Sequence, residues 1–269
     1  MQGIYLAARA MKPLAVAALL AGLALPLLAH AETLAPTCDA PLDLLRLTYP
    51  LSRVAQKLAT HEPITIVAIG SSSTAGAGAS SPAASYPSRL TVELKERFPN
   101  QPITMINRGA NGEEIGDMLK RFDSAVAAAK PDLVLWQLGT NSVIRDHMFT
   151  DDGAAIRTGL GKIRAIGADV VLIDPQFAPK VIAKPDAGRM VELIATTAKR
   201  EDADLFRRFD VMKRWREVDQ MPFETFVSAD GLHLNDWSYA CMAKGLGLAI
   251  AEAAQRPVIS ATAMSHLVP

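Results

Sequence analysis

The sequence predicts an α/β fold, a three-layer sandwich in which a parallel sheet lies between two layers of helices. Short runs that are apolar nearly throughout alternate with longer segments of helical periodicity from Ile64 to Ala254. Strands that are apolar on both faces are typical of parallel sheets covered by helices. Neither an internal repeat nor a linker interrupts this alternation. Residues 63–269 are therefore expected to form one domain.

The expected elements follow one another as strand, loop and helix. Strands are expected at Ile64–Ile69, Ile103–Ile106, Leu133–Leu138, Val170–Ile173 and Leu205–Phe206. Helices are expected at Tyr86–Phe98, Ile115–Ala129, Ala154–Ile166, Met190–Lys199 and Trp237–Ala254. Asn235 or Asp236 is placed to cap the last helix. Residues 32–62 form a lead-in whose leucines recur at helical spacing, with an interruption around Pro50.

The first 31 residues have the pattern of a secretory signal peptide. Arg9 and Lys12 precede an uncharged apolar stretch, and Ala29-His30-Ala31 fits a cleavage site. The alternative is a membrane anchor, but Pro26 and the shortness of the apolar stretch argue against a stable span. We expect cleavage after Ala31, no stable membrane anchor afterwards, and a secreted or periplasmic protein.

Charge and cysteine content bound the possible partners and compartment. Without Arg9 and Lys12 the 28 basic residues fall to 26 against 28 acidic residues, a net charge of −2. This balance gives no reason to expect a nucleic acid as partner. Cys38 and Cys241 both survive cleavage, and an even pair in an exported protein indicates a possible disulfide. Two buried free thiols are the alternative.

Four polar loops carry the residue types that acyl transfer needs. Three follow strands: Ser71-Ser72-Ser73, Asn111-Gly112 and Gly139-Thr140-Asn141. The fourth, residues 230–235, precedes the last helix. In doubly wound sheets such loops converge at the carboxyl edge of the strands. A nucleophile, a base, an orienting acid and oxyanion donors are all available there.

His233 is the candidate base because Asp230 stands three residues before it on a turn containing Gly231. That spacing lets the carboxylate fix the imidazole tautomer and leaves the other ring nitrogen for a serine proton. An Asp/His pair that caps the last helix is the alternative. His61 and His266 are expected to be packing or surface residues, and the role of His147 stays open.

Taken together, these blocks resemble the SGNH/GDSL hydrolase family over about residues 64–249. The matching blocks are Gly70-Ser71-Ser72, Gly112, Gly139-Thr140-Asn141 and Asp230-Gly231-Leu232-His233. The resemblance implies Ser72 as nucleophile, His233 as base and Asp230 as its partner. It implies an oxyanion hole formed by Ser72 N–H, Gly112 N–H and the Asn141 amide. It also implies a flavodoxin-like sheet of five parallel strands in the order 2-1-3-4-5.

Two positions depart from the family's usual pattern. Ser71 stands where the family usually has Asp before the nucleophile, and Ser142 stands where it often has Asp after the asparagine. Neither is a reacting group. Because three serines adjoin, the choice of Ser72 over Ser73 depends on aligning Gly70.

Other Gly-rich or metal-binding sites do not fit the sequence. The stretch from Gly70 to Gly78 has no Lys, which a P-loop requires, and no Gly-x-Gly-x-x-Gly opens a helix there. Thr74 stands where a Gly-x-Ser-x-Gly elbow needs its second glycine. The histidines are scattered and the cysteines far apart, so neither a metal ion nor another cofactor is expected.

These observations predict an exported serine hydrolase that cleaves carboxylic esters through a Ser-His-Asp triad. The expected substrates are small esters or O-acylated glycans or lipids. The absence of a long apolar lid segment favours short acyl or O-acetyl groups. A non-catalytic glycan-binding module and an O-acyltransferase on the same fold remain alternatives, and the oligomeric state stays open.

Overall fold

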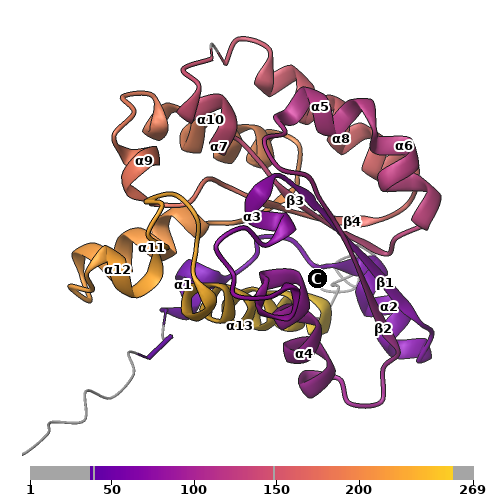
Figure 1. Cartoon of the computed structure of the whole chain (residues 1–269). Helices are drawn as coiled ribbons and strands as arrows, with labels where there is room; N and C mark the ends of the chain where they lie inside the picture. Colours follow the sequence, from indigo (N-terminus) through magenta and orange to yellow (C-terminus); the bar gives the residue numbers. More distant parts are fainter. Residues whose placement is uncertain (1–36, 39, 148, 257–269) are drawn as a thin grey trace, which may run out of the picture. The chain divides into compact units, whose positions relative to one another are not determined.

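A computed structural model of the chain describes residues 37–38, 40–147 and 149–256 (Figure 1). The predicted signal peptide, residues 1–31, and His266 lie outside these described residues. The chain divides into two units, Met1–Thr37 and Cys38–Pro269. The elements below all belong to the second unit.

The centre of this unit is a sheet of five parallel strands in the order β2-β1-β3-β4-β5. The strands are β1 (Ile64–Gly70), β2 (Ile103–Gly109), β3 (Leu133–Gln137), β4 (Asp169–Ile173) and β5 (Asp204–Phe206). The predicted fold class, with its parallel sheet and strand order, is confirmed. Each of the four connections between successive strands contains at least one helix, as connections between parallel strands usually do.

Successive residues of each central strand enter two different cores. In β3, Leu133 and Leu135 pack into one apolar cluster, while Val134 and Trp136 pack into the other. All four are at most 2% exposed. Because the side chains of a strand alternate between its faces, a strand buried on both sides must be apolar at every position. This explains the continuous apolar runs in the sequence.

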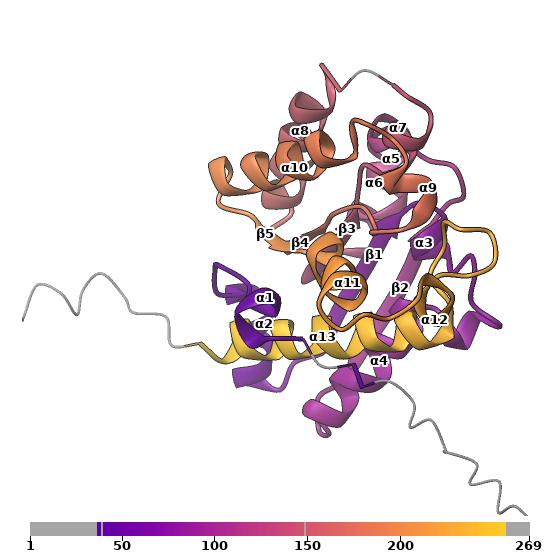
Figure 2. The ribbon, with the colours of Figure 1, turned by 90° about the vertical axis from the view of Figure 1, so that its left-hand side faces the viewer.

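Helices cover the two faces in two groups (Figures 1 and 2). The first core contains residues of α1 (Leu42–Leu45), α2 (Ser52–Thr60), α4 (Tyr86–Arg97), α11 (Arg208–Glu217), α12 (Phe223–Phe226) and α13 (Asp236–Gln255). The second contains residues of α5 (Ile115–Lys120), α6 (Phe122–Ala125), α7 (Thr140–Ile144), α8 (Asp152–Ala165), α9 (Pro179–Ile182) and α10 (Ala187–Arg200). The remaining short elements are α3 (Ser72–Ala75), η1 (Pro82–Ala84) and η2 (Ala127–Ala129).

The segment expected as one helix, Ile115–Ala129, is instead three short elements. The break between α5 and α6 falls at Arg121, whose backbone leaves the helical conformation (φ −104°, ψ 8°). Its guanidinium donates to the Glu113 carboxylate at 2.6 Å and to the Arg108 carbonyl at 2.7 Å. These contacts tie the helix to the loop after β2, which helical periodicity alone did not reveal.

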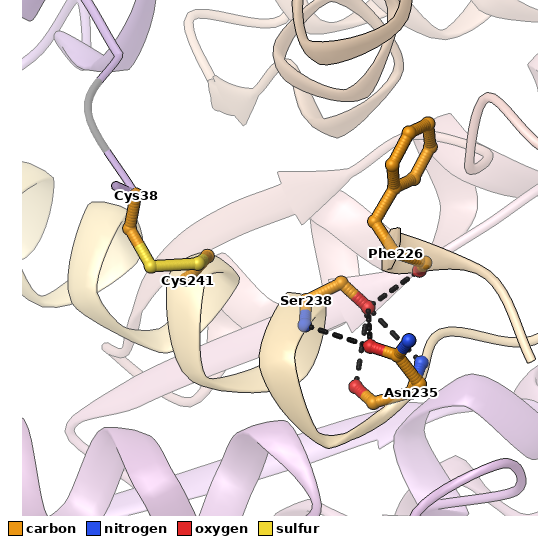
Figure 3. Close-up of a disulfide and its surroundings, with 5 residues drawn as sticks. All are labelled: Cys38, Phe226, Asn235, Ser238 and Cys241. Carbon is orange, nitrogen blue, oxygen red and sulfur yellow. Dashed lines mark hydrogen bonds between the residues drawn. A yellow bond between two sulfur atoms is a disulfide. The ribbon is translucent and has the colours of Figure 1, made fainter. Parts of the chain in front are cut away.

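The long C-terminal helix α13 begins with a side-chain cap. The Asn235 side chain accepts a hydrogen bond from the Ser238 N–H at 3.1 Å, and the Ser238 hydroxyl donates to the Phe226 carbonyl at 2.6 Å (Figure 3). Asn235 is thus the cap, one of the two residues predicted. In the same figure, a disulfide joins Cys241 of α13 to Cys38. Of the two arrangements left open by the sequence, the structure has the bridge.

Two tryptophans are core residues. Trp136 of β3 is 2% exposed and Trp215 of α11 is 1% exposed. Across residues 37–38, 40–147 and 149–256, the structure contains no helix with the length and apolar character needed to cross a membrane.

Candidate active site

The predicted polar loops gather at the carboxyl edge of the sheet. Helix α3, which begins at Ser72, directly follows β1, the loop 110–114 follows β2, and α7 follows β3 after Leu138 and Gly139. The loop 227–235 leads into α13 and reaches the same edge. This is the edge at which parallel α/β sheets form their ligand sites.

Ser72, His233 and Asp230 are in direct contact. The Ser72 hydroxyl lies 2.8 Å from His233 Nε2, and His233 Nδ1 lies 2.5 Å from Asp230 Oδ2. Ser72 and His233 are separated by 161 residues in sequence. The serine oxygen therefore faces one ring nitrogen while the carboxylate holds the other, which is the arrangement a serine nucleophile and its base require.

A tight turn holds Asp230 and His233 in a fixed position relative to one another. Asp230 Oδ1 accepts hydrogen bonds from the N–H groups of Leu232 and His233, both at 2.9 Å, and from the Ser228 hydroxyl at 2.7 Å. Gly231 supplies the left-handed conformation of this turn (φ +69°). Because α13 is capped by Asn235, the Asp230–His233 pair does not serve as its cap.

The same contacts keep the carboxylate ionised. Burial acts to raise the pKa of Asp230, but the hydrogen bonds from His233, Leu232 and Ser228 outweigh it and hold the pKa well below its usual range. An ionised Asp230 accepts a hydrogen bond from His233 Nδ1 and so selects the tautomer with its proton on that nitrogen. His233 Nε2 is then free to accept the proton of Ser72.

The serines on either side of Ser72 have different surroundings. Ser71 is 2% exposed, and its N–H and hydroxyl both donate to Gln137 Oε1, at 2.9 and 3.0 Å. Ser73 is 1% exposed, whereas Ser72 is only half-buried. Of the three serines, Ser72 is the one within hydrogen-bond distance of His233. Ser71 instead joins α3 to the end of β3.

Gln137 was not singled out in the sequence. It is 1% exposed at the last position of β3, and its Oε1 also lies 3.3 Å from the Thr74 hydroxyl. A glutamine inside an apolar strand gives no sequence signal for a role at a site, because only the fold brings α3 over it. The hydroxyl of Ser71 is one of three donors to this buried amide oxygen, with the Ser71 N–H and the Thr74 hydroxyl.

The two candidate oxyanion donors, Gly112 and Asn141, are held close together because the Asn141 side chain is hydrogen-bonded to the residue that follows Gly112. Asn141 is 6% exposed, and its Nδ2 donates to the Glu113 carbonyl at 2.7 Å, using one of its two hydrogens. Gly112 has a left-handed backbone (φ +78°). The loop is also joined to β1, since the Ala110 N–H donates to the Gly70 carbonyl at 2.9 Å.

The last residue of the loop 110–114, Glu114, contacts two basic side chains. Glu114 accepts from Arg145 Nη1 at 2.6 Å and contacts His147 Nδ1 at 2.9 Å. Burial acts to raise the pKa of Glu114, but these two partners lower it overall. A side-chain carbon added at Gly112 would lie 3.1 Å from Arg145 Nη2. His147, whose role the sequence left open, lines a surface pocket of about 490 Å³ together with Phe149 and Arg189.

Solved structures with the same fold include carbohydrate esterases and an α/β hydrolase. A two-domain esterase active on acetylated mannans superposes with a TM-score of 0.69 at 17% identity, over 83% of this chain and 59% of that one. The chain thus spans less than two thirds of that esterase. A catalytic mutant of an acetylxylan esterase from Geobacillus stearothermophilus gives 0.58 at 16% identity, over 70% and 94% of the chains. An α/β hydrolase from the Lake Arreo metagenome, Spain, gives 0.61 at 20% identity, over 73% and 99%.

At these identities the likeness establishes the fold. No curated protein matches the sequence. A family model described as the non-GDSL lipase-like family matches residues 37–256, which include every strand and all the polar loops above. The description "non-GDSL" agrees with the sequence at one position, since Ser71 stands where the GDSL pattern has its aspartate. The chain belongs to the non-GDSL lipase-like family.

Proposed function

We propose that the protein is an exported serine hydrolase of the SGNH type that removes short acyl groups, O-acetyl groups above all, from glycans. The observation that carries this proposal is the continuous contact from Ser72 Oγ through the His233 ring to the Asp230 carboxylate, at 2.8 and 2.5 Å. Acyl transfer requires an activated nucleophile next to hydrogen-bond donors for the oxyanion, here a serine beside backbone and amide N–H groups.

In the proposed reaction, Ser72 Oγ bonds to the ester carbonyl carbon while its proton passes to His233 Nε2. The carbonyl electron pair moves onto the oxygen, and the oxyanion accepts hydrogen bonds from Ser72 N–H, Gly112 N–H and Asn141 Nδ2. The bond to the alcohol oxygen then breaks, and His233 protonates the leaving alcohol. Water attacks the acyl-Ser72 ester by the same route, which releases the carboxylic acid and restores the serine.

The comparisons support the ester hydrolase and its substrate class. The two-domain esterase acts on acetylated mannans, and the Geobacillus enzyme is an acetylxylan esterase. Catalytic mutants of the latter replace a serine, a histidine and an aspartate, and that aspartate precedes the histidine by three positions. Asp230 and His233 have the same spacing.

Export belongs to the same proposal. Residues 1–31 would be removed as a signal peptide, and residues 32–62 would lead into one hydrolase domain, 63–269. The disulfide between Cys38 and Cys241 supports an oxidising compartment such as the periplasm or the cell exterior. N-terminal sequencing of the exported protein should find Glu32 first, and an intact Met1 end would contradict the proposed cleavage.

Hydrolysis rates on p-nitrophenyl esters of increasing chain length test the activity and its acyl preference. We expect the highest kcat/KM on acetyl and other short esters, and acetate release from acetylated mannan or xylan. Ser72→Ala is the control and should abolish both. A strong preference for long chains would contradict the short-acyl assignment, and no hydrolysis of any ester would favour the glycan-binding alternative.

The same assay separates hydrolysis from O-acyl transfer. Added sugar acceptors should leave the yield of free acetate unchanged if water is the acceptor. Acetylated sugar formed at the expense of free acetate would identify a transferase that uses the same catalytic residues.

A further inference from the structure

A buried glutamine joins the two halves of the candidate site. Gln176 follows β4 by three residues and is 0% exposed. Its Oε1 accepts a hydrogen bond from the Thr140 hydroxyl at 2.9 Å, and its Nε2 donates to the Leu232 carbonyl at 3.1 Å. Both ends of one amide are thus paired with groups from different loops.

The partners of Gln176 stand directly next to two of the proposed functional residues. Thr140 is the first residue of α7 and precedes Asn141, and Leu232 precedes His233. Thr140 is itself only 3% exposed. A shift of Gln176 would therefore be passed through one residue to the oxyanion donor on one side and to the base on the other.

The backbone around Gln176 is held firmly enough to act as a reference point. Two residues earlier, Asp174 Oδ1 accepts from the Phe209 N–H at 2.9 Å, and the Asp174 carbonyl accepts from Arg208 Nε at 2.9 Å. The Gln176 carbonyl accepts from the Ala178 N–H at 3.1 Å. These contacts fix the segment to α11 and to its own turn, so the amide is anchored independently of the loops that it joins.

We propose that Gln176 is a positioning residue that sets the place of His233 relative to Asn141. The inference rests on the proposed function, because it assigns a purpose to the distance between the base and the oxyanion donor. A primary amide suits this purpose, since it carries an acceptor and a donor at the end of one short side chain. In a buried place the loss of either bond leaves a carbonyl or a hydroxyl without its partner.

Gln176→Met tests the proposal, because it keeps the length of the side chain and removes both hydrogen bonds. We expect kcat on p-nitrophenyl acetate to fall about 10- to 100-fold with KM changed less than about twofold, since small misplacements of reacting groups cost this much. Gln101→Met is the matched control. Gln101 is also a buried glutamine (7% exposed) whose Nε2 donates to a backbone carbonyl, that of Glu62, but it precedes β2 at the opposite edge of the sheet.

Thr140→Val removes one of the same bonds from the other side. If Gln176 acts through Thr140, the double variant Gln176→Met/Thr140→Val should be no slower than Gln176→Met alone, a non-additive result. If Gln176→Met does not fold, Thr140→Val carries the test alone, and a kcat equal to that of Gln101→Met would then overturn the proposal.

Gln176→Glu adds a readout that a purely structural role would not move. A protonated carboxyl has the donor and acceptor of the amide, whereas an ionised one lacks the donor for Leu232. The activity of Gln176→Glu relative to wild type should therefore rise as the pH is lowered, while that of Gln176→Met stays constant.

The outcomes separate this inference from the proposed function. An active wild-type enzyme whose kcat falls equally in Gln176→Met and Gln101→Met overturns the inference alone, as does an active Gln176→Met with unchanged kcat. A wild-type protein that hydrolyses no ester removes the proposed function, and the inference with it.

Discussion

Three consecutive serines have three different environments at the end of β1. Ser72 contacts His233, Ser71 donates twice to the buried Gln137 oxygen, and Ser73 is enclosed. Ser71, which stands where the GDSL pattern has aspartate, thus has a local structural role. Gln137 Oε1 already accepts from two donors of one residue, and a carboxylate in place of the Ser71 hydroxyl would turn a second acceptor toward it.

Ser71→Asp should therefore destabilise the protein, although it introduces the residue of the GDSL pattern. We expect a loss of about 1–3 kcal/mol in the free energy of unfolding, the cost of burying an acceptor without a donor. Ser71→Ala, which only removes the hydroxyl bond, should lose less, on the order of 1 kcal/mol. Urea unfolding of both variants measures the difference, and a Ser71→Asp protein as stable as wild type would contradict this account of Gln137.

The buried carboxyl of Asp174 contributes to the way stability depends on pH. Burial raises the pKa of Asp174 to about 7, and the Phe209 N–H and the Arg208 charge offset this only in part. Arg208 is 1% exposed beside it. A group with a raised native pKa binds more protons when folded, so its contribution to stability is present below about pH 4 and is lost as the pH rises to about 7.

Asp174→Asn should flatten the fall in stability between about pH 4 and pH 7. The difference can reach on the order of 4 kcal/mol, because each unit of pKa shift corresponds to about 1.4 kcal/mol. Melting temperatures of the two proteins across this range measure it. Parallel curves for wild type and Asp174→Asn would show that Asp174 does not carry the raised pKa.

At the scale of elements, the segment after α3 packs on the loop that holds His233. Gly78 has a left-handed backbone (φ +86°), and a Cβ built on it would lie 2.3 Å from the Leu234 carbonyl oxygen and 2.8 Å from His233 Cβ. The Tyr239 hydroxyl holds the same segment through the Ala77 carbonyl at 2.7 Å. The helix that carries Ser72 and the loop that carries His233 are therefore kept together by a contact that only glycine permits.

Gly78→Ala should push the His233 loop away from Ser72. We expect kcat to fall at least about tenfold and the free energy of unfolding to fall by about 1–2 kcal/mol, from the strained backbone and the close contact. Gly161→Ala is the control: Gly161 lies within α8, and a Cβ there would meet nothing within 4 Å. It should keep full activity and gain about 0.5–1 kcal/mol. Equal activities of the two variants would contradict this packing role.

The strands and helices differ in how well the sequence predicts them. The strands were predictable because a strand buried on both faces is apolar throughout. The short helices α3 and α7 were not, because Ser72–Ala75 and Thr140–Ile144 are too short and too polar to show helical periodicity. The residues now in contact at the site, Ser72, Asp230 and His233, came from spacing and family resemblance. Gln137 was missed, because a glutamine that will be buried looks like any other glutamine in sequence, whereas the position of Gln176 just after the fourth predicted strand already placed it at the edge of the sheet where the site lies.

At the scale of the whole molecule, the disulfide closes most of the chain into one loop. Cys38 and Cys241 are 203 residues apart, and Cys241 is 3% exposed within α13. A crosslink over this length restricts the unfolded chain far more than the folded one. The bridge thus attaches Cys38 to α13, the helix that directly follows the loop containing His233.

Cys38→Ser/Cys241→Ser should lower the free energy of unfolding by up to about 5 kcal/mol while leaving kcat near the wild-type value at low temperature. The site has no side chain from either cysteine, so the loss should appear in stability alone. Urea unfolding with and without a reductant measures it. A wild-type protein whose unfolding is unaffected by the reductant, with two thiols titrating in urea, would contradict the bridge.

The proposed function depends above all on Ser72 being an activated nucleophile. Intact mass spectrometry after reaction with a fluorophosphonate probe, followed by peptide mapping, tests it most directly. We expect one adduct per chain, located on Ser72, and no adduct on Ser72→Ala. An unlabelled wild-type protein, or an adduct on Ser73 that survives in Ser72→Ala, would contradict it.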